Sequence, residues 1–345
     1  IRSGHLMPGA RLPSTQALAA QWQIQQTTVQ YALAHLTREG LLDRRPRLGT
    51  YVRRTDATIT RAAIYLPEDI WADPARSFLQ SVCGAITEAL KERGIMGHVV
   101  VNPSGGEREE PWDDLIKEAE RRKFQVLIGL VFNNNPIKWL NKLPLPTAFL
   151  TEASIPNRVV SDYLQFFSES MNVLHAQGCR SVGLITSVPL TPTRQSAPDI
   201  AFYNYFKKAA ETRGIEWRKE WLTECEFTRA HQAEEKGYEA FRRLWKRKRR
   251  PEGLIVFPDM VARGVLIGVM SLHVDVPREL KLVLHRNREV GLVSSVPVTF
   301  MDVCVNEVAK DLIDMVERQF AGKPIEPVLF KFHPTPGGGG QTRDR

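Results

Sequence analysis

Residues 13–52 read PSTQALAAQWQIQQTTVQYALAHLTREGLLDRRPRLGTYV and indicate the architecture of the first domain. Ser14 is a good helix N-cap, which predicts a first helix over 15–21. Apolar residues then recur at helical spacing and predict a second helix that Gly40 ends: Val29, Ala32, Leu33 and Leu36. Two short strands follow, on either side of a basic tip at 44–48. Two helices at a short turn followed by a basic hairpin are the plan of a winged helix-turn-helix.

The same residues resemble a known family. The matching pieces, in order, are Pro8 to Ser14, Leu18-Ala19, Thr27-Thr28-Val29, Ala32-Leu33, Leu36, Glu39 to Leu42 and Gly49 to Val52. They are similar to the winged helix of the gluconate-repressor (GntR) family. The resemblance implies that the second helix enters the major groove of DNA and that the wing tip reaches the minor groove. The residues then expected to contact DNA are Arg11, Ser14, Gln16, Gln25, Gln26, Thr27, Thr28, Gln30, Arg44, Arg45, Arg47 and Gly49.

The chain departs from that family at three positions of the head. Gln16, Gln26 and Gln30 stand where the family often has arginine. Glutamine pairs well with adenine but carries no charge, whereas arginine binds phosphate and reads guanine. We therefore expect the helices to anchor phosphate weakly, and a larger share of the phosphate contacts to come from four arginines: Arg11, Arg44, Arg45 and Arg47.

The distribution of charge supports a nucleic-acid partner. Residues 1–54 contain eight arginines and two acids, so they carry +6 of the overall net charge of +8. A small basic unit on a near-neutral remainder is typical of nucleic-acid binders. The alternative is that Arg44, Arg45 and Arg47 only solvate a surface loop. The helices and glycines in register with them favour a DNA-binding role.

From Arg61 onward the pattern changes to short apolar strands that alternate with amphipathic helices. Strands are predicted near 62–66, 99–101, 126–131, 147–150, 181–186, 253–257, 280–284 and 298–301. Helices are predicted near 78–90, 112–122, 164–177, 201–213, 233–246, 260–272 and 306–320. Such alternation is typical of parallel sheets covered on both faces, and the number of strands favours two doubly wound lobes. The predicted fold class is therefore α/β, with an N-terminal winged helix-turn-helix.

This second region is similar to the type I periplasmic sugar-binding fold that serves as the sensor of lac- and purine-type repressors. The matching pieces are 176–185, 209–215, 251–259, 276–280 and 322–324. With the head, the chain looks like the arabinose-repressor branch. The predicted boundaries are a DNA-binding domain at 1–54, a linker at 55–60, a sensor at 61–333 and a flexible tail at 334–345. The resemblance implies three crossings between the lobes, near Ser161, Arg288 and Gly322. Lobe one is therefore expected at 61–160 and 289–321, and lobe two at 161–288 and 322–333.

Ligands of doubly wound sheets bind beyond the carboxyl ends of the strands. The residues there that we expect to bind an effector are Trp71, Phe132, Asp199, Asp259 and Arg286. Asp259 matches the family's hydroxyl-binding aspartate, although Pro258 replaces the usual preceding asparagine. Both aromatics suit stacking on a sugar ring or packing between lobes. Asp199 and Arg286 stand where the family often has the opposite charges, which indicates either a charge swap or a shifted alignment.

Other functional classes fit less well. No nucleophile, phosphate-loop, dinucleotide or zinc motif follows a strand and opens a helix, so we expect neither an enzyme nor a cofactor or metal. The cysteines are widely spaced, and neither a signal peptide nor a membrane-spanning run is expected, which favours the cytoplasm. The basic run at 242–250 is interpreted as a solvated helix end. The expected protein is a homodimeric repressor of operator DNA with a sugar-like effector, and a periplasmic-type solute-binding protein is the alternative. Induction and corepression both stay open.

Overall fold

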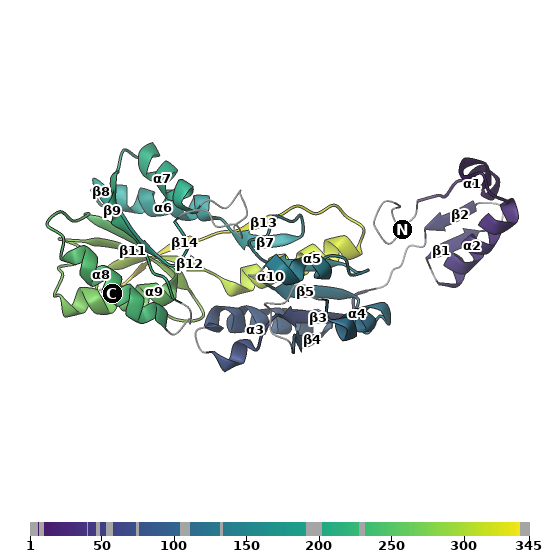
Figure 1. Cartoon of the computed structure of the whole chain (residues 1–345), viewed down its shortest axis with the longest axis horizontal. Coiled ribbons are helices and arrows are strands. Elements are labelled where there is room, and N and C mark those ends of the chain that lie inside the picture. Colours follow the sequence, from purple (N-terminus) through teal and green to yellow (C-terminus); the bar gives the residue numbers. More distant parts are fainter. Residues whose placement is uncertain are drawn as a thin grey trace, which may run out of the picture.

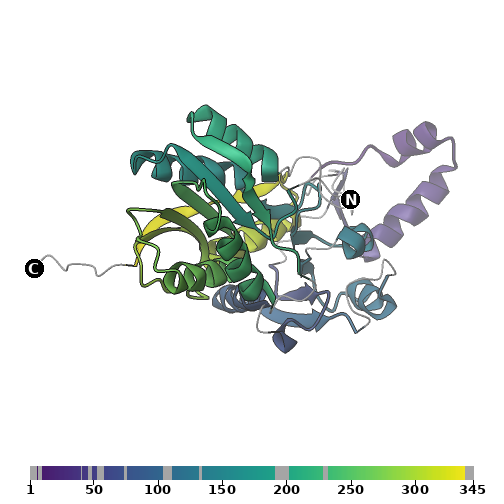
Figure 2. The same ribbon diagram turned by 60° about the vertical axis from the view of Figure 1, so that its left-hand side comes forward.

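The computed structural model describes residues 6, 10–39, 41–45, 49–52, 58–73, 76–103, 111–131, 134–190, 202–227 and 232–338. Figure 1 shows a small N-terminal head followed by two α/β lobes along the long axis of the chain. Figure 2 shows from a second side that helices cover both faces of the sheets. The predicted fold class is confirmed: a winged helix-turn-helix precedes a two-lobed, largely parallel α/β domain.

The head is held together by a core of its own. Helix α1 (Thr15–Trp22) begins behind Ser14, whose hydroxyl accepts a hydrogen bond from the Ala17 backbone N–H at 3.1 Å. Helix α2 (Gln26–Arg38) follows, and strand β1 (Leu42–Arg45) pairs antiparallel with β2 (Gly49–Val52). The buried apolar residues of the head are Leu18, Val29, Leu33, Leu42 and Val52. Because all four elements contribute to this core, the opposite side of α2 is left free to face outward.

The first lobe contains a sheet whose six strands are all parallel, in the order β13-β7-β6-β5-β3-β4. Its strands are β3 (Arg61–Leu66), β4 (Met96–Val101), β5 (Val126–Leu130), β6 (Thr147–Leu150), β7 (Arg158–Ser161) and β13 (Val328–Phe330). Its helices are α3 (Ser77–Glu92), α4 (Asp113–Glu120), α5 (Asn134–Leu140) and α10 (Val305–Phe320), with a 3-10 turn η1 (Ile70–Ala72) after β3.

Alternation along β3 explains how both faces of this sheet are buried. Ile64 and Leu66 belong to a core that contains α3 and α10, whereas Ala63 and Tyr65 belong to a core that contains α4 and α5. Successive side chains of a strand point to opposite faces of the sheet. The side chains of the continuous apolar run at 62–66 therefore pack against a helix layer on each face of the sheet.

The second lobe contains a six-stranded sheet in the order β14-β12-β11-β10-β8-β9. Five strands are parallel, namely β8 (Ser181–Thr186), β9 (Glu216–Glu224), β10 (Gly253–Phe257), β11 (Lys281–Asn287) and β12 (Val298–Val303). Strand β14 (His333–Gly337) closes one edge antiparallel to β12. The helices are α6 (Tyr163–Ala176) and α7 (Phe202–Thr212), whose apolar residues join one core, and α8 (Ala233–Trp245) and α9 (Asp259–Ser271), whose apolar residues join the other.

The chain passes between the lobes three times. The first crossing follows Ser161 at the end of β7. The second lies at Cys304 rather than near Arg288, because β12 pairs with β11 and keeps the chain in the second lobe. The third lies between β13 and β14, at Lys331, rather than near Gly322. The expected crossings came from the family resemblance, which does not fix the residue at which this chain leaves a sheet. The pairing of β12 with β11 and of β14 with β12 moves the second and third crossings along the chain.

The predicted flexible tail also differs from the structure. Residues 333–337 form β14, with Met301 opposite Pro334 and Thr299 opposite Pro336. Prolines lack a backbone N–H, but an edge strand tolerates them where that position faces away from the ladder. The sequence HPTPG therefore belongs to the sheet.

Two of the crossings are fastened to each other. The side-chain amide of Gln165 donates to Phe332 O at 2.8 Å and accepts from Phe332 N at 3.0 Å. Asp162 accepts from the ammonium of Lys331, and its own backbone N–H donates to Phe330 O at 3.1 Å. Tyr163 of α6 donates to Glu152, in the loop after β6, at 2.8 Å. We call Asp162, Gln165, Lys331 and Phe332 the hinge clasp.

Candidate functional site

The outward side of α2 carries the residues expected to contact DNA. Gln25, Gln26, Thr27, Thr28 and Gln30 are all exposed, whereas Val29 is buried between them. No side chain caps the first turn of α2, so backbone N–H groups of that turn are available to a phosphate. The arrangement presents polar side chains and the positive end of the helix dipole on one surface.

Arg11 lies across the wing. Gly49 opens β2 with a φ of +118°, and a Cβ added to it would lie 3.0 Å from Arg11 Nε. Glycine at this position therefore lets the guanidinium of Arg11 approach the hairpin backbone. Arg11 and Arg44 are exposed, while Arg47 and the side chain of Arg45 lie outside the described residues. Gln16 is also exposed on α1, and Ser14 acts as the cap of that helix.

One exposed side chain of the head was missed by the sequence analysis. Tyr31, on α2, is 76% exposed, although tyrosine is more often partly covered. The 3.6-residue spacing from Val29 and Leu33 places it away from the head core, and this spacing could have identified it.

In the sensor, a buried polar cluster lies at the carboxyl end of β10 and β11. Asn287 donates to Asp259 Oδ2 at 2.9 Å, and the Asp259 backbone N–H donates to His285 Nδ1 at 3.1 Å. The three side chains are 4–5% exposed. The carboxylate of Asp259, the first residue of α9, also accepts from Met260 N at 2.9 Å. We call Asp259, His285 and Asn287 the polar cluster.

The polar cluster was only partly predicted. Asp259 was expected, whereas His285 and Asn287 were not singled out as ligands. Both alternate along β11 with Arg286, so they lie on one face of the sheet and Arg286 on the other. Hydrogen-bond donors and acceptors at the carboxyl edge of two neighbouring strands suit a hydroxyl-bearing ligand.

Arg286 is bound inside the second lobe. Its guanidinium donates to both carboxylate oxygens of Asp302, at 2.6 and 2.7 Å, and to the Thr335 hydroxyl at 3.1 Å. It also lies 3.9 Å from the centre of the Phe300 ring. Since the side chain of Asp302 is 1% exposed, this is a buried bidentate pair. Arg286 is therefore engaged by Asp302, Phe300 and Thr335 rather than extended towards an anionic effector.

Asp302 is held in its charged form by these contacts. Burial acts to raise the pKa of its carboxyl, but hydrogen bonds from Arg286 and Thr335 outweigh burial and lower the pKa below its ordinary value. A second guanidinium lies near the same carboxylate, because Arg288 Nε is 3.6 Å from Asp302 Oδ2.

Of the remaining predicted effector residues, Trp71 lies in the described part of the chain. Trp71, on η1, is 53% exposed and available for contact. Phe132 and Asp199 lie outside the described residues. The hypothesis of a charge swap between Asp199 and Arg286 thus has a structural alternative, which is the pair of Arg286 and Asp302.

Burial lowers the pKa of His285 to about 4, because the charged imidazolium is poorly solvated there. Its Nδ1 accepts a hydrogen bond, so the neutral ring carries its proton on Nε2. The aromatic rings of Phe257 and Phe332 lie 4.6 and 5.8 Å from the imidazole centre. The polar cluster is therefore free of positive charge at neutral pH.

This shift predicts a pH effect on stability. The unfolded chain binds a proton at His285 below about pH 6.5, while the folded chain does so only below about 4. Stability is thus lost as the pH falls from 6.5 to 4, by roughly 3 kcal/mol in total. In His285→Asn, whose amide oxygen replaces Nδ1 as acceptor, we expect this loss to be absent from urea unfolding curves measured at both pH values. Equal pH dependence in both proteins would refute the assignment.

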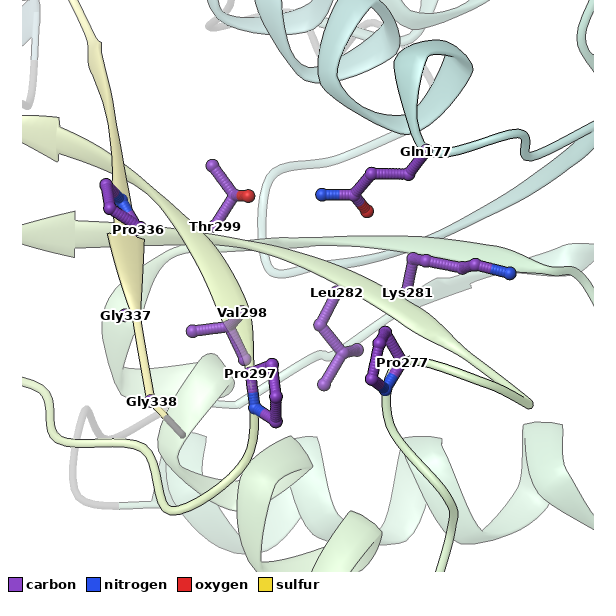
Figure 3. Close-up of a pocket in the computed structure, with 10 residues that line it drawn as sticks. All are labelled: Gln177, Pro277, Lys281, Leu282, Pro297, Val298, Thr299, Pro336, Gly337 and Gly338. Carbon is purple, nitrogen blue, oxygen red and sulfur yellow. The ribbon is translucent and has the colours of Figure 1, made fainter. Parts of the chain in front are cut away.

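The second lobe also contains a cavity at another place. It has a volume of about 470 Å³ and is lined by Gln177, Lys281, Leu282, Val298, Thr299 and neighbouring prolines and glycines (Figure 3). Lys281 and Val298 begin their strands, so the cavity lies at the amino edge of the second sheet. It is therefore distinct from the polar cluster at the carboxyl edge.

Other chemistries find little support in the described part of the chain. Cys83, Cys179 and Cys225 are buried, and burial raises the pKa of each thiol to about 11, so none is an activated nucleophile. The described residues contain no group of three His, Cys, Asp or Glu side chains placed to share a metal ion. Every described helix is too short or too polar to cross a lipid bilayer.

Comparison with known proteins identifies both domains. Residues 1–52 match the profile of the bacterial regulatory proteins of the gntR family, and residues 171–336 match the periplasmic binding protein-like domain. The HTH-type transcriptional repressor PurR of Glaesserella parasuis is 26% identical over 140 residues, which are 39% of this chain and 40% of PurR. The chain spans about two fifths of the length of the first curated relatives it matches.

Solved structures show the same fold. A LacI family transcription regulator from Clostridium acetobutylicum has a TM-score of 0.63 at 20% identity, covering 80% of this chain and 98% of its own. The transcriptional regulator CelR in complex with cellobiose has a TM-score of 0.62 at 15% identity, covering 95% of this chain and 100% of its own. These proteins are named as transcription regulators, the class of protein that the sequence predicted.

Proposed function

We propose that this chain, which joins a gntR-type winged helix to a periplasmic-binding-protein-like sensor, is a transcription repressor controlled by a small effector. One observation carries the proposal: a single chain presents the exposed polar face of α2 beside a basic wing and, in its other domain, a buried polar cluster at a sheet's carboxyl edge. The first feature suits duplex DNA and the second a small molecule.

The effector is a neutral, hydroxyl-rich molecule such as a sugar. Asp259 supplies an acceptor, Asn287 an amide, and neutral His285 adds no charge. Arg286, the cation expected to attract a carboxylate or phosphate, is engaged by Asp302. The known ligand of a neighbouring fold, cellobiose in the CelR complex, is of the same chemical class.

Regulation follows from coupling the two domains. Two copies of the chain form a homodimer in the cytoplasm and place two heads on a pseudo-palindromic operator. An effector that binds one lobe arrangement more tightly shifts the population of that arrangement. A coupling of about 1–3 kcal/mol would change operator affinity several-fold to a hundredfold.

The effector proposal predicts a difference between two variants. In Asp259→Ala we expect the melting-temperature increase produced by the effector to be lost, because a ligand hydroxyl loses its acceptor. The double variant Arg286→Met/Asp302→Leu removes both charges of the buried pair and is expected to keep the increase. A thermal-shift screen of sugars, sugar acids and sugar phosphates measures both. The opposite pattern would instead indicate an anionic effector.

The DNA-binding part has its own test. Random-sequence duplex is titrated with the protein by fluorescence anisotropy at several NaCl concentrations, and association that weakens with salt is expected. A dimer is checked by light scattering of the same sample. If no duplex binds at low salt while a sugar still raises the melting temperature, the chain is a solute-binding protein without DNA regulation.

A further inference from the structure

The second lobe carries a dense cluster of cations at 242–250. Seven of these nine residues are Lys or Arg, and all seven are exposed. The seven are Arg242, Arg243, Lys246, Arg247, Lys248, Arg249 and Arg250. We call them the distal basic patch.

The helix dipole explains only part of this cluster. Helix α8 ends at Trp245, and its last turn contains Arg242 and Arg243. Cations in a last turn offset the partial negative charge there, but the effect does not extend beyond that turn. Four of the seven, Arg247 to Arg250, lie past the cap residue Lys246, in the turn that leads to β10. The interpretation as a simple helix end is therefore incomplete.

The turn is rigidly held by two tryptophans. The Arg250 guanidinium lies 4.5 Å from the Trp245 ring centre, and that ring stacks on Phe241 at 5.5 Å. On the other side, Trp221 Nε1 donates to Arg249 O at 3.1 Å. The cations are thus presented from an ordered backbone, which reduces the entropy lost when they bind a partner.

Helix α8 is itself fixed to its neighbour by direct backbone contact. A Cβ added to Gly264 of α9 would lie 1.8 Å from Glu234 O, and one added to Gly237 of α8 would lie 2.2 Å from Val261 O. The two helices therefore touch without intervening side chains, and the patch cannot shift along α9.

Most of the patch charge is not neutralised within the described chain. Arg243 lies 3.7 Å from Glu239, but no described acid lies within 4.0 Å of Lys246, Arg247, Lys248, Arg249 or Arg250. Among described residues, no large apolar side chain between 232 and 252 is exposed. Protein interfaces usually contain an apolar core, whereas binding to a nucleic-acid backbone needs no apolar surface and is driven mainly by cations.

The patch lies far from the head. Strand β10 is parallel with its neighbours and its carboxyl end faces the crossings, so the turn before it lies at the outer edge of lobe two. Residues 58–60, which come from the head, enter lobe one at the amino end of β3, its own outer edge. Figure 1 shows α8 and β9 at the end opposite to α1 and α2. A straight duplex under the head therefore does not reach the patch.

We propose that the distal basic patch binds the phosphate backbone of a second segment of duplex DNA, so that one molecule bridges two segments. This inference rests on the proposed function, since the head must bind the first segment. The patch makes no base contacts, and its binding is independent of sequence and sensitive to salt.

The test compares two variants that lose the same charge. Lys246→Gln/Arg247→Gln/Lys248→Gln changes exposed patch residues that make no described ion pair. Lys142→Gln/Lys208→Gln/Lys323→Gln removes three exposed cations elsewhere. With the head saturated by an unlabelled duplex, log affinity for a second, labelled random-sequence duplex is measured against log NaCl concentration. Each lost phosphate contact reduces the slope of this second binding step by about 0.9, so we expect a reduction of about 2 to 3 in the patch variant and little change in the control.

A second measurement detects bridging. A biotinylated duplex on beads captures a second, fluorescent duplex through the protein, and we expect the patch variant alone to lose this capture. If both variants match the wild type in slope and capture, the inference is wrong while the proposed function stands. If the patch variant loses only binding to phosphatidylglycerol vesicles, the patch serves a membrane and the inference is also wrong. If the wild type binds no duplex at all, the proposed function fails first.

Discussion

Replacing Arg11, Arg44, Arg45 and Arg47 together with alanine is expected to abolish most duplex binding by the head. If each arginine neutralises one phosphate, the slope of log affinity against log salt falls by nearly 4, and affinity near 0.1 M salt falls roughly a thousandfold. The reason is that the beginning of α2 carries no charge: Gln26 and Gln30 can hydrogen-bond to DNA but are neutral, and Arg38 lies in the last turn of the helix. Anisotropy titrations with a random-sequence duplex measure both quantities.

One control measurement and one further variant separate a loss of charge from a loss of folding. The near-ultraviolet and far-ultraviolet circular dichroism of the four-arginine variant should match the wild type, since Arg11 and Arg44 are exposed and do not belong to the head core. Gln26→Arg/Gln30→Arg, which adds charge on α2, is expected to steepen the slope by about 2. A four-arginine variant that keeps the wild-type slope would show that the wing is not the phosphate anchor.

Replacing Asp302 with alanine is expected to lower the free energy of unfolding by about 3–5 kcal/mol, because the partly buried guanidinium of Arg286 loses its carboxylate partner. Urea unfolding at pH 7 measures the loss. Since the pKa of Asp302 is lowered in the folded chain, its stabilising effect is present above the ordinary carboxyl pKa and disappears as the pH falls below that value.

The control for this prediction replaces both partners. Arg286→Met/Asp302→Leu leaves no stranded charge, and we expect it to recover most of the stability lost in Asp302→Ala. Two apolar side chains of similar volume suit the contact with Phe300. If the double variant is as unstable as the single one, packing rather than charge pairing is the main contribution of Asp302.

Much of the fold followed from local patterns. The run at 62–66 predicted a buried strand, and Ser14 followed by helix formers predicted the start of α1. Strand β9 was missed because EWRKEWLTE is rich in charge, which an edge strand with solvent on one side tolerates. Strand β14 was missed because its two prolines are typical of a loop.

The candidate sites were less predictable. The outward placement of Gln26 and Thr28 followed from helical spacing around Val29. The role of Arg286 did not, because its partner Asp302 comes from another strand and Thr335 from the segment expected to be a tail. A single sequence gives the alternation along β11, which separates Arg286 from His285 and Asn287, but not the strand that lies beside it.

The hinge clasp restricts how the lobes can rearrange. Sliding the strand that leaves β13 past the start of α6 would break both Gln165 amide hydrogen bonds to Phe332 together with the contact of Asp162 and Lys331. Twisting about an axis through the clasp keeps all of them. We therefore expect closure around an effector to be a rotation of one lobe about an axis through the hinge clasp. Such a closure would reach the heads as a change in the angle between the lobes and not as a change in the distance between them.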